Sequence, residues 1–156
     1  MNAGSKVRGL ETLAYASTLA RDLGPAEIDA MLLDARTFNA SVEVTGVLLQ
    51  GAGQFFQVIE GTRAALDDVF RRIEAARAHR DIRILMRKPL RERNFASWHM
   101  GFASAPQTAV QELSQFAWED AVPLTRTTFE TPQGLALAIE HWSRWSALES
   151  DSVIAR

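Results

Sequence analysis

The sequence predicts an α+β fold in which two helices cover one face of a mainly antiparallel sheet. Apolar residues recur at helical spacing in two segments and alternate with a period of two in the segments around them. Glycine-containing turn residues join two of the alternating segments directly, as in a β-hairpin. The predicted order is β-α-β-β-α-β-β, which is the ferredoxin-like arrangement, and further helices follow it.

The first strand and first helix are predicted from residue 10 onward. The strand is expected over LETLAYAST, residues 10–18, where small and aromatic residues alternate weakly. The helix is expected over GPAEIDAMLLDARTFNA, with Pro25 near its first helical position and Glu27 in its first turn. Its apolar residues Ile28, Met31, Leu32 and Ala35 recur at helical spacing.

A hairpin is predicted after this helix. Its strands are VEVTGVLLQ (residues 42–50) and QFFQVIE (residues 54–60), and the turn is GAG (residues 51–53). Glycine supplies the positive φ that tight turns demand. Alternation in the second strand puts Gln57 on the same face as its apolar neighbours Phe55 and Ile59.

The second helix and the last two strands complete the predicted domain. Helical spacing of apolar residues extends over residues 62–79, and residues 81–87 alternate as a short strand. After a turn-like stretch, WHMGFAS (residues 98–104) is expected to form the last strand.

The chain beyond Pro106 has a different sequence pattern, with helical and polar stretches in place of strands. A helical stretch around residues 109–118, a polar linker over residues 123–134 and an amphipathic helix over residues 135–148 are expected. This tail could cover the open face of the sheet or contact another chain. We therefore predict an N-terminal tail (1–9), one domain (10–104) and a C-terminal helical extension (105–156).

Composition excludes several kinds of site. A chain of 156 residues suits one compact domain with an appendage. It has no cysteine, which excludes disulfides and thiolate chemistry, and its three histidines (His79, His99 and His141) lack zinc-binding spacing, so we expect no metal. No signal peptide and no run of about 18 apolar residues is found, and we expect a cytoplasmic protein.

Basic residues are concentrated in one part of a chain whose net charge is −2. Nine of the seventeen Lys and Arg residues lie between Arg71 and Arg93. They could form a solvated helix face with an arginine-rich loop, contact a phosphate group, or bind nucleic acid. Aromatic residues are not interleaved as stacking platforms would require, which argues against nucleic acid.

Five residues are candidates for a polar or aromatic site. Gln57 needs hydrogen-bond partners if it is buried, because each unpaired group costs about 1–3 kcal/mol. Backbone, another side chain or a ligand could supply them. Tyr15, the only tyrosine, lies in the middle of a strand, and Asn39 ends the first helix, where asparagine often serves as a cap. Trp98 and Met100 are expected on one face of the last strand, an arrangement typical of a core.

Together these positions resemble the BLUF family, the blue-light sensors using flavin, from Leu10 to about Ser104. The similarity lies in four blocks that match without a gap between them: LAYAST with the strand-one tyrosine, FNASVEVTG with the helix-one asparagine, FFQVIEG with the glutamine, and RNFASWHMGF with the W-x-M strand. A shared Tyr, Asn, Gln, Trp and Met in register makes the resemblance specific.

The resemblance implies a flavin, FAD or alternatively FMN, held between the two helices with its ring over the sheet. Tyr15 would be the photochemical electron and proton donor, and Gln57 the hydrogen-bond switch between the phenol and the flavin. Asn39 would bind the polar edge of the ring. Trp98 and Met100 would transmit the change along the last strand.

The second helix would supply further contacts to the flavin. By the same resemblance, Arg72 approaches the ribityl-phosphate tail and Ile73 packs near the ring. The family's D-x-R-H pattern is replaced by ARAH, so only its last residue, His79, matches as a cofactor-binding candidate. Phe38 and Ala35 replace residues that are often polar in the family. These departures leave the ring site intact and concern the tail of the flavin.

We therefore expect a blue-light photoreceptor without a catalytic output domain, and not an enzyme. It would signal through its C-terminal helices, a homo-oligomer or a partner protein, with no membrane or nucleic-acid partner. A rival hypothesis is a light-insensitive ferredoxin-like interaction module or scaffold that retains the site residues. A small flavin-dependent reductase has little support, because no nicotinamide-binding motif is found.

Overall fold

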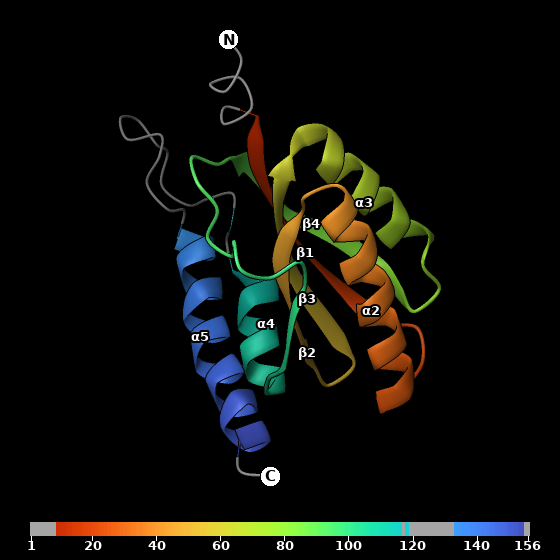
Figure 1. Cartoon of the computed structure of the whole chain (residues 1–156). Helices are drawn as coiled ribbons and strands as arrows, with labels where there is room; N and C mark the ends of the chain where they lie inside the picture. The colour runs from red at the N-terminus through yellow and green to blue at the C-terminus, as the bar shows by residue number, and fades with distance from the viewer. Residues whose placement is uncertain (1–8, 117, 119–132, 155–156) are drawn as a thin grey trace.

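The structure is a computed structural model and describes residues 9–116, 118 and 133–154 of the chain. It confirms the predicted α+β, ferredoxin-like fold with C-terminal helices (Figure 1). In chain order the elements are β1 (Leu10–Leu19), α2 (Pro25–Ser41), β2 (Thr45–Gly51), β3 (Gln54–Thr62), α3 (Arg63–Ala75), β4 (His79–Pro89), β5 (Gly101–Ser104), α4 (Gln107–Gln115) and α5 (Gln133–Ile154).

The sheet has five strands in the order β4-β1-β3-β2-β5. Three neighbouring pairs are antiparallel, and only β2 and β5 run parallel. In the middle of the sheet Gln57 of β3 pairs with Tyr15 of β1 on one side and with Leu48 of β2 on the other. Side chains directly opposite each other on neighbouring strands share a face and lie close together. Tyr15, Gln57 and Leu48 therefore form one row across the sheet.

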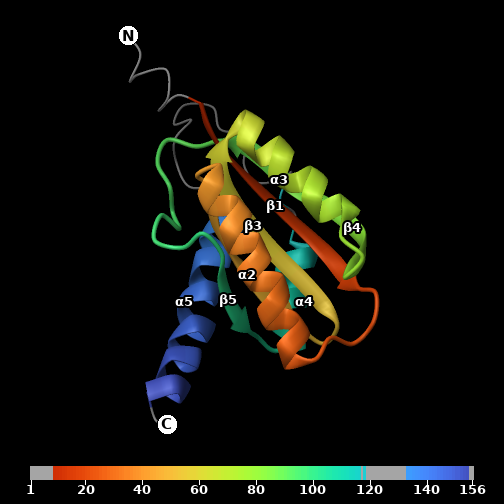
Figure 2. The ribbon, with the colours of Figure 1, turned by 45° about the vertical axis from the view of Figure 1, so that its right-hand side comes forward.

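Helices cover both faces of this sheet. α2 and α3 lie over one face, and α4 and α5 lie over the other (Figures 1 and 2). Each strand divides its residues between the two layers: Tyr15 and Phe55 belong to the core under α2 and α3, whereas Ala16 and Phe56 belong to the core under α4 and α5. The alternation in the sequence therefore corresponds to two separate cores, one on each face.

The C-terminal helices cover the open face of the sheet, which was one of the two alternatives left by the sequence. The ring of Trp142 on α5 is 6% exposed and packs at the start of β5. A Cβ atom on Gly101 would lie only 2.8 Å from Trp142 Cη2, so the absence of a side chain there lets the indole reach the strand. Trp118 and Leu135 belong to the same core.

Pro25 and Glu27 lie at the start of α2 as expected, and Thr62 caps the start of α3. Pro25 is the first residue of α2, and the carboxylate of Glu27 accepts a hydrogen bond from the backbone N–H of Gly24 at 3.1 Å. α3 begins after Thr62, whose hydroxyl accepts from the backbone N–H of Ala65 at 3.2 Å. These contacts satisfy N–H groups that a helix leaves unpaired at its start.

The hairpin turn also follows the prediction, although its first strand is shorter than expected. Ala52 and Gly53 have φ values of 49° and 79°, and two successive positive values are typical of the turns that suit a twisted hairpin. The strand predicted from residue 42 begins at Thr45. Glu43 has a φ of 58°, so the chain turns there after α2 before it extends.

Two further element boundaries were predicted wrongly. The second helix was expected to reach His79, but α3 ends at Ala75 and His79 is the first residue of β4, where it pairs with Leu19 of β1. Ala76, at the C-cap, has extended dihedral angles, because the chain reverses there to join the sheet. The last strand was expected from Trp98, but β5 begins only at Gly101.

Several expectations concern residues outside the described part of the chain. The predicted polar linker over residues 123–134 lies there except for its last two residues, which begin α5. The predicted N-terminal tail lies there except for residue 9. Among the helices that the structure describes, none combines the length and the apolar character needed to cross a membrane.

Most of the concentrated basic residues contact acidic groups or carbonyl oxygens of the protein itself. This supports the solvated-face interpretation for them. The ion pairs are Arg71 with Asp68, Arg80 with Asp81, and Arg87 with both Glu11 and Asp67. Arg93 donates to three oxygens of the chain. Arg72 differs, because it lines a cavity that is described next.

Candidate functional site

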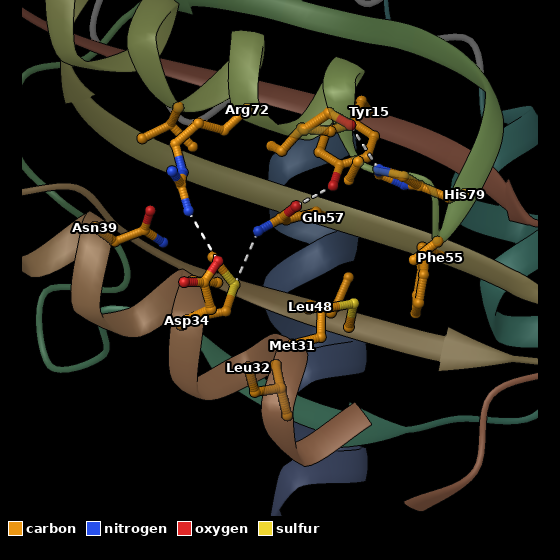
Figure 3. A pocket seen from close by; sticks show the side chains of 16 residues that line it. Tyr15, Met31, Leu32, Asp34, Asn39, Leu48, Phe55, Gln57, Arg72 and His79 are labelled. Carbon is orange, nitrogen blue, oxygen red and sulfur yellow. Dashed lines mark hydrogen bonds and ion pairs between the residues drawn. The ribbon is translucent and has the colours of Figure 1, made fainter. Parts of the chain in front are cut away.

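A cavity of about 130 Å³ lies between α2, α3 and the central strands of the sheet (Figure 3). Its walls are mostly apolar, and its polar side chains include Tyr15 from β1, Gln57 from β3, Asn39 from α2 and Arg72 from α3. The apolar side chains of the walls include Met31, Leu32, Leu48, Phe55, Val69 and Ile73. Such a lining suits a flat, largely apolar ligand with polar atoms at its edge.

Gln57 is the centre of a short chain of hydrogen bonds on the floor of this cavity. The Tyr15 hydroxyl donates to Gln57 Oε1, and Gln57 Nε2 donates to the sulfur of Met100 at 2.9 Å (Figure 3). All three side chains are 2–5% exposed. The partners that the buried amide required are therefore side chains. Thioether sulfur is only a weak acceptor, and the NH₂ group has a second hydrogen, so the amide can still donate to a ligand.

Tyr15 is held as a neutral phenol. Burial raises the pKa of its hydroxyl far above the ordinary value, because no water is available to stabilise the phenolate. Phe70 and His79 pack with their rings edge-on to the phenol, with centroids 5.9 and 6.1 Å away. The hydroxyl therefore keeps its proton at neutral pH and points it at Gln57.

Asn39 lies at the end of the cavity nearest to the start of β5. Its side chain is not a cap of its own helix, because Nδ2 donates to the backbone carbonyl of His99 at 2.7 Å. The residue is 2% exposed and lines the cavity. The amide thus joins α2 to the chain just before β5 and has a further N–H and an oxygen for a ligand.

The rim of the cavity carries an ion pair between the two helices. Arg72 Nη2 lies 2.8 Å from Asp34 Oδ2, and both residues line the cavity (Figure 3). The guanidinium also lies over the ring of Phe38, 4.3 Å from its centroid. Both charged side chains are largely solvent-exposed, so the pair is weak and Arg72 can exchange Asp34 for another anion.

His79 closes the cavity on the β4 side. Its Nε2 lies 2.9 Å from the carbonyl oxygen of Ile73, so that nitrogen carries the hydrogen, and its Nδ1 then accepts from the Ser17 hydroxyl at 2.8 Å. Burial lowers the pKa of the imidazole, although the bond to Ile73 opposes this. The ring is therefore neutral at pH 7.

The seven residues predicted to bind a cofactor all line this cavity. They are Tyr15, Asn39, Gln57, Arg72, Ile73, His79 and Met100. They come from five elements and the chain before β5, and the fold brings them together. Their roles towards a bound molecule stay predictions.

Trp98, in contrast, lies outside the cavity, and the prediction that it shares a face with Met100 was wrong. Met100 is 2% exposed and contacts Gln57, whereas Trp98 is 42% exposed and packs edge-on against Trp142 of α5, with ring centroids 5.4 Å apart. Residues two apart share a face only in an extended strand. β5 begins at Gly101, so the chain at Trp98 and Met100 is free to bend.

Sequence reasoning missed one charged residue of the site. Asp34 is not among the residues predicted for the site, yet it lines the rim of the cavity and pairs with Arg72. Its spacing of three residues after Met31, which also lines the cavity, could have indicated a shared side of the helix. Among the described residues, no three His, Asp or Glu side chains gather as a metal site would require.

Comparison with known proteins agrees with this geometry. The sequence model of a family described as "BLUF: Sensors of blue-light using FAD" matches residues 10–101. The beta subunit of photoactivated adenylate cyclase from Euglena gracilis is 32% identical over 101 residues, which are 64% of this chain and 12% of that protein. The chain thus spans a small part of the curated relatives that it matches.

Two solved structures show the same fold. The dark-state structure of BlrB, a BLUF protein, is 33% identical and covers 63% of this chain and 74% of its own, with a TM-score of 0.60. Klebsiella pneumoniae BlrP1 with FMN and cyclic diGMP is 38% identical and covers 61% of this chain and 25% of its own, with a TM-score of 0.57. Since the family match covers more than half of the sequence, the chain belongs to the BLUF family, the sensors of blue light using FAD.

Proposed function

We propose that this protein is a blue-light photoreceptor that binds a flavin non-covalently in the cavity between α2 and α3. The observation on which the proposal rests is the hydrogen-bonded series Tyr15, Gln57 and Met100 on the cavity floor. The buried phenol of Tyr15 is a redox-active group, and the buried amide of Gln57 can switch its hydrogen bonds. The two groups are in contact next to an apolar cavity. Membership of a family of light sensors supports the same conclusion.

The lining of the cavity fits an isoalloxazine ring. Its walls are mostly apolar, and the amides of Gln57 and Asn39 supply N–H groups and oxygens of the kind that pair with the polar edge of such a ring. Ile73 would pack near the ring. Arg72 at the rim can leave Asp34 for the phosphate of the flavin tail, because guanidinium binds phosphate well. His79 would complete the binding site on the β4 side.

FAD is the proposed flavin, and FMN is the alternative. The family description names FAD, and a related structure of BlrP1 contains FMN. Both share the ring and the first phosphate, which are the parts that the cavity lining would contact. The choice between them depends on what lies beyond the rim.

The protein side of the light response starts from Tyr15. A bound flavin would supply the absorption of blue light and, when excited, the oxidising power to take an electron from a phenol. A phenol that loses an electron becomes strongly acidic, so the Tyr15 proton would move along its hydrogen bond to Gln57 Oε1, and Gln57 Nε2 would give up a proton to the group that took the electron. Return of the electron and of a proton to Tyr15 would leave the Gln57 amide with its donor and acceptor sides exchanged, by rotation or tautomerisation. The surrounding apolar side chains exclude water that would otherwise compete for these hydrogen bonds.

The output would pass through the β5 end of the sheet to the C-terminal helices, and the chain itself would not be catalytic. Met100 contacts Gln57, and Trp98, two residues earlier, contacts Trp142 of α5. A change at Gln57 can therefore shift the population of two arrangements of α5. We propose that α5 acts on a partner protein or on a second copy of this chain, in the cytoplasm.

Absorption spectroscopy of the purified protein tests the proposed function. We expect a yellow protein whose flavin bands shift reversibly to longer wavelength under blue light. Tyr15→Phe and Gln57→Leu should keep the flavin bound but lose this shift, because each removes one partner of the hydrogen bond between them. A colourless preparation that takes up neither FAD nor FMN would refute flavin binding. A full red shift in either variant would refute the roles of the two residues.

A further inference from the structure

Residues 93–100, called here the connecting segment, make up most of the connection from β4 to β5 and end at Met100. They contain no helix and no strand. The backbone N–H of Gly46 donates to the Trp98 carbonyl at 2.9 Å, and the other contacts that place the segment come from side chains. The segment is functionally important because Met100 contacts the Gln57 amide. What holds the segment therefore also sets this contact.

The first part of the segment is held by Glu60. Both carboxylate oxygens of Glu60 accept from the backbone N–H of Asn94 at 2.9 Å, Oε1 also accepts from the N–H of Phe95 at 2.9 Å, and Oε2 accepts from Asn94 Nδ2 at 3.2 Å. Glu60 is fully buried. Burial raises the pKa of its carboxyl, and these N–H donors oppose the rise. A buried carboxylate with several N–H donors holds them firmly, because it has no water to replace them.

Arg93 reinforces this attachment without pairing directly with the Glu60 carboxylate. Its Nη1 donates to the backbone carbonyl of Glu60 and to Thr45 Oγ1, both at 2.9 Å, and its Nη2 donates to the carbonyl of Glu43 at 2.8 Å. The start of the segment is thus attached to β3, to β2 and to the turn before β2. The partners of the Glu60 carboxylate named above are all N–H groups of the connecting segment. The buried carboxylate therefore holds that segment in place.

Glu60 lies on β3 three residues after Gln57 and therefore on the opposite face of the strand. It does not line the cavity, and it cannot act on a ligand there directly. Because β3 is paired on both sides, Glu60 and Gln57 keep a constant relative position. Because Glu60 holds the segment and Gln57 contacts Met100, β3 fixes the position of the segment relative to the Gln57 amide.

The last residue of the segment is held from the other side by Arg36 of α2. Arg36 Nε donates to the backbone carbonyl of Met100 at 2.8 Å. Arg36, like Glu60, does not line the cavity. The contact of Met100 with Gln57 runs through a thioether sulfur, which is too weak an acceptor to hold the side chain by itself. The Met100 backbone must therefore be placed by other groups.

We propose that Glu60 and Arg36 are positioning residues of the light response: they hold the two ends of the connecting segment and so keep Met100 against the Gln57 amide. The proposal rests on the proposed function, because it concerns the same switch. Loss of either anchor lets Met100 move away, and the Gln57 amide then rotates against less resistance. The altered variants should return from the light-induced state to the dark state faster than the wild type.

Dark-recovery kinetics of matched variants test the proposal. Arg36→Met keeps the length of the side chain and removes the donor, and Glu60→Gln keeps the shape and replaces one acceptor oxygen by a donor. Controls are Arg63→Met and Glu74→Gln, two exposed residues of α3. We expect bound flavin and a red shift in all four, with recovery about fivefold faster in the first two, the effect of one hydrogen bond. Both controls should recover at the wild-type rate.

A double-mutant cycle separates positioning from a general loss of stability. If Arg36 acts through Met100, Arg36→Met should accelerate recovery in the wild-type background and have no effect in a Met100→Leu background, because the sulfur contact is already lost. The same acceleration in both backgrounds would overturn the proposal. So would a wild-type recovery rate in Arg36→Met, and this variant decides the question if Glu60→Gln does not fold.

The outcome also distinguishes this proposal from the proposed function. A wild-type protein that binds no flavin or shows no red shift refutes both. A wild-type protein that responds to light while Arg36→Met and Glu60→Gln recover like their controls refutes the positioning role alone. Lower melting temperatures with unchanged recovery would likewise assign the two residues to stability only.

Discussion

Gly101→Ala should weaken the attachment of α5 to the sheet. The added Cβ would lie 2.8 and 2.9 Å from two ring carbons of Trp142 and 3.3 Å from Cγ of Trp98. Favourable carbon contacts begin at about 3.5 Å, so the Trp142 ring has to move by roughly 0.7 Å. Trp142 is 6% exposed and packed into the core, so the ring can yield only by disturbing its neighbours. Overpacking of this kind costs about 1–3 kcal/mol.

Thermal unfolding and tryptophan fluorescence measure this effect. For a domain of this size about 2 kcal/mol corresponds to a fall in Tm of roughly 4–8 °C. Indole emission should shift to longer wavelength as Trp142 becomes hydrated. Trp142→Phe gives a smaller ring, so it should cost less stability in the Gly101→Ala background than in the wild type. A wild-type Tm for Gly101→Ala, or penalties that simply add in the double variant, would refute the close approach of α5 to β5.

Three further predictions concern other parts of the fold. Because burial lowers the pKa of His79, the unfolded chain takes up a proton before the folded chain does as the pH falls below about 6.5, and the free energy of unfolding should decrease there. Urea titrations at several pH values should show that the free energy of unfolding depends less steeply on pH in His79→Gln than in the wild type. Gly46→Ala would place a Cβ 2.1 Å from the Val58 carbonyl oxygen in the paired strand, and expression trials should yield no soluble protein, since backbone cannot move aside. Trp98→Ala removes the edge-on contact with Trp142 and should cost about 1 kcal/mol, measured as a lower urea midpoint; an unchanged midpoint would show that the contact adds no stability.

Alternation in β3 predicted one part of the candidate site, the position of Gln57 on the face of Phe55. The approach of Tyr15 to Gln57 was implied only by the family resemblance, and the register of β1 with β3 places the two residues directly opposite each other. Asn39 and Arg72 were placed only through the family resemblance, and the structure brings both to the cavity. The contact between Arg72 and Asp34 was not predictable, because it joins two helices, and the sequence of neither helix determines how the two are rotated relative to each other.

The wrong element boundaries have separate physical causes. Residues 98–100 were expected to begin the last strand, but their carbonyl groups accept hydrogen bonds from the backbone N–H of Gly46 and from the side chains of Asn39 and Arg36. Earlier in the same connection the N–H groups of Asn94 and Phe95 donate to Glu60, and a charged residue in the otherwise buried stretch VIEG was the one local sign of this attachment. The end of α3 was misplaced because its helical composition continues past the point where the chain must join the sheet.

The sequence by itself determined the order of the elements, the fold class and the two faces of β3, because these depend on periodicity and turn residues within a few positions of each other. Only the tertiary structure decided that α4 and α5 cover the second face, that Trp98 and Met100 diverge, and that a buried Glu60 anchors the segment between them. These features join residues that are distant in the chain, and they depend on which surfaces pack together. Local patterns indicate which surfaces are apolar, whereas packing and hydrogen bonding across the whole fold determine which of these surfaces contact each other.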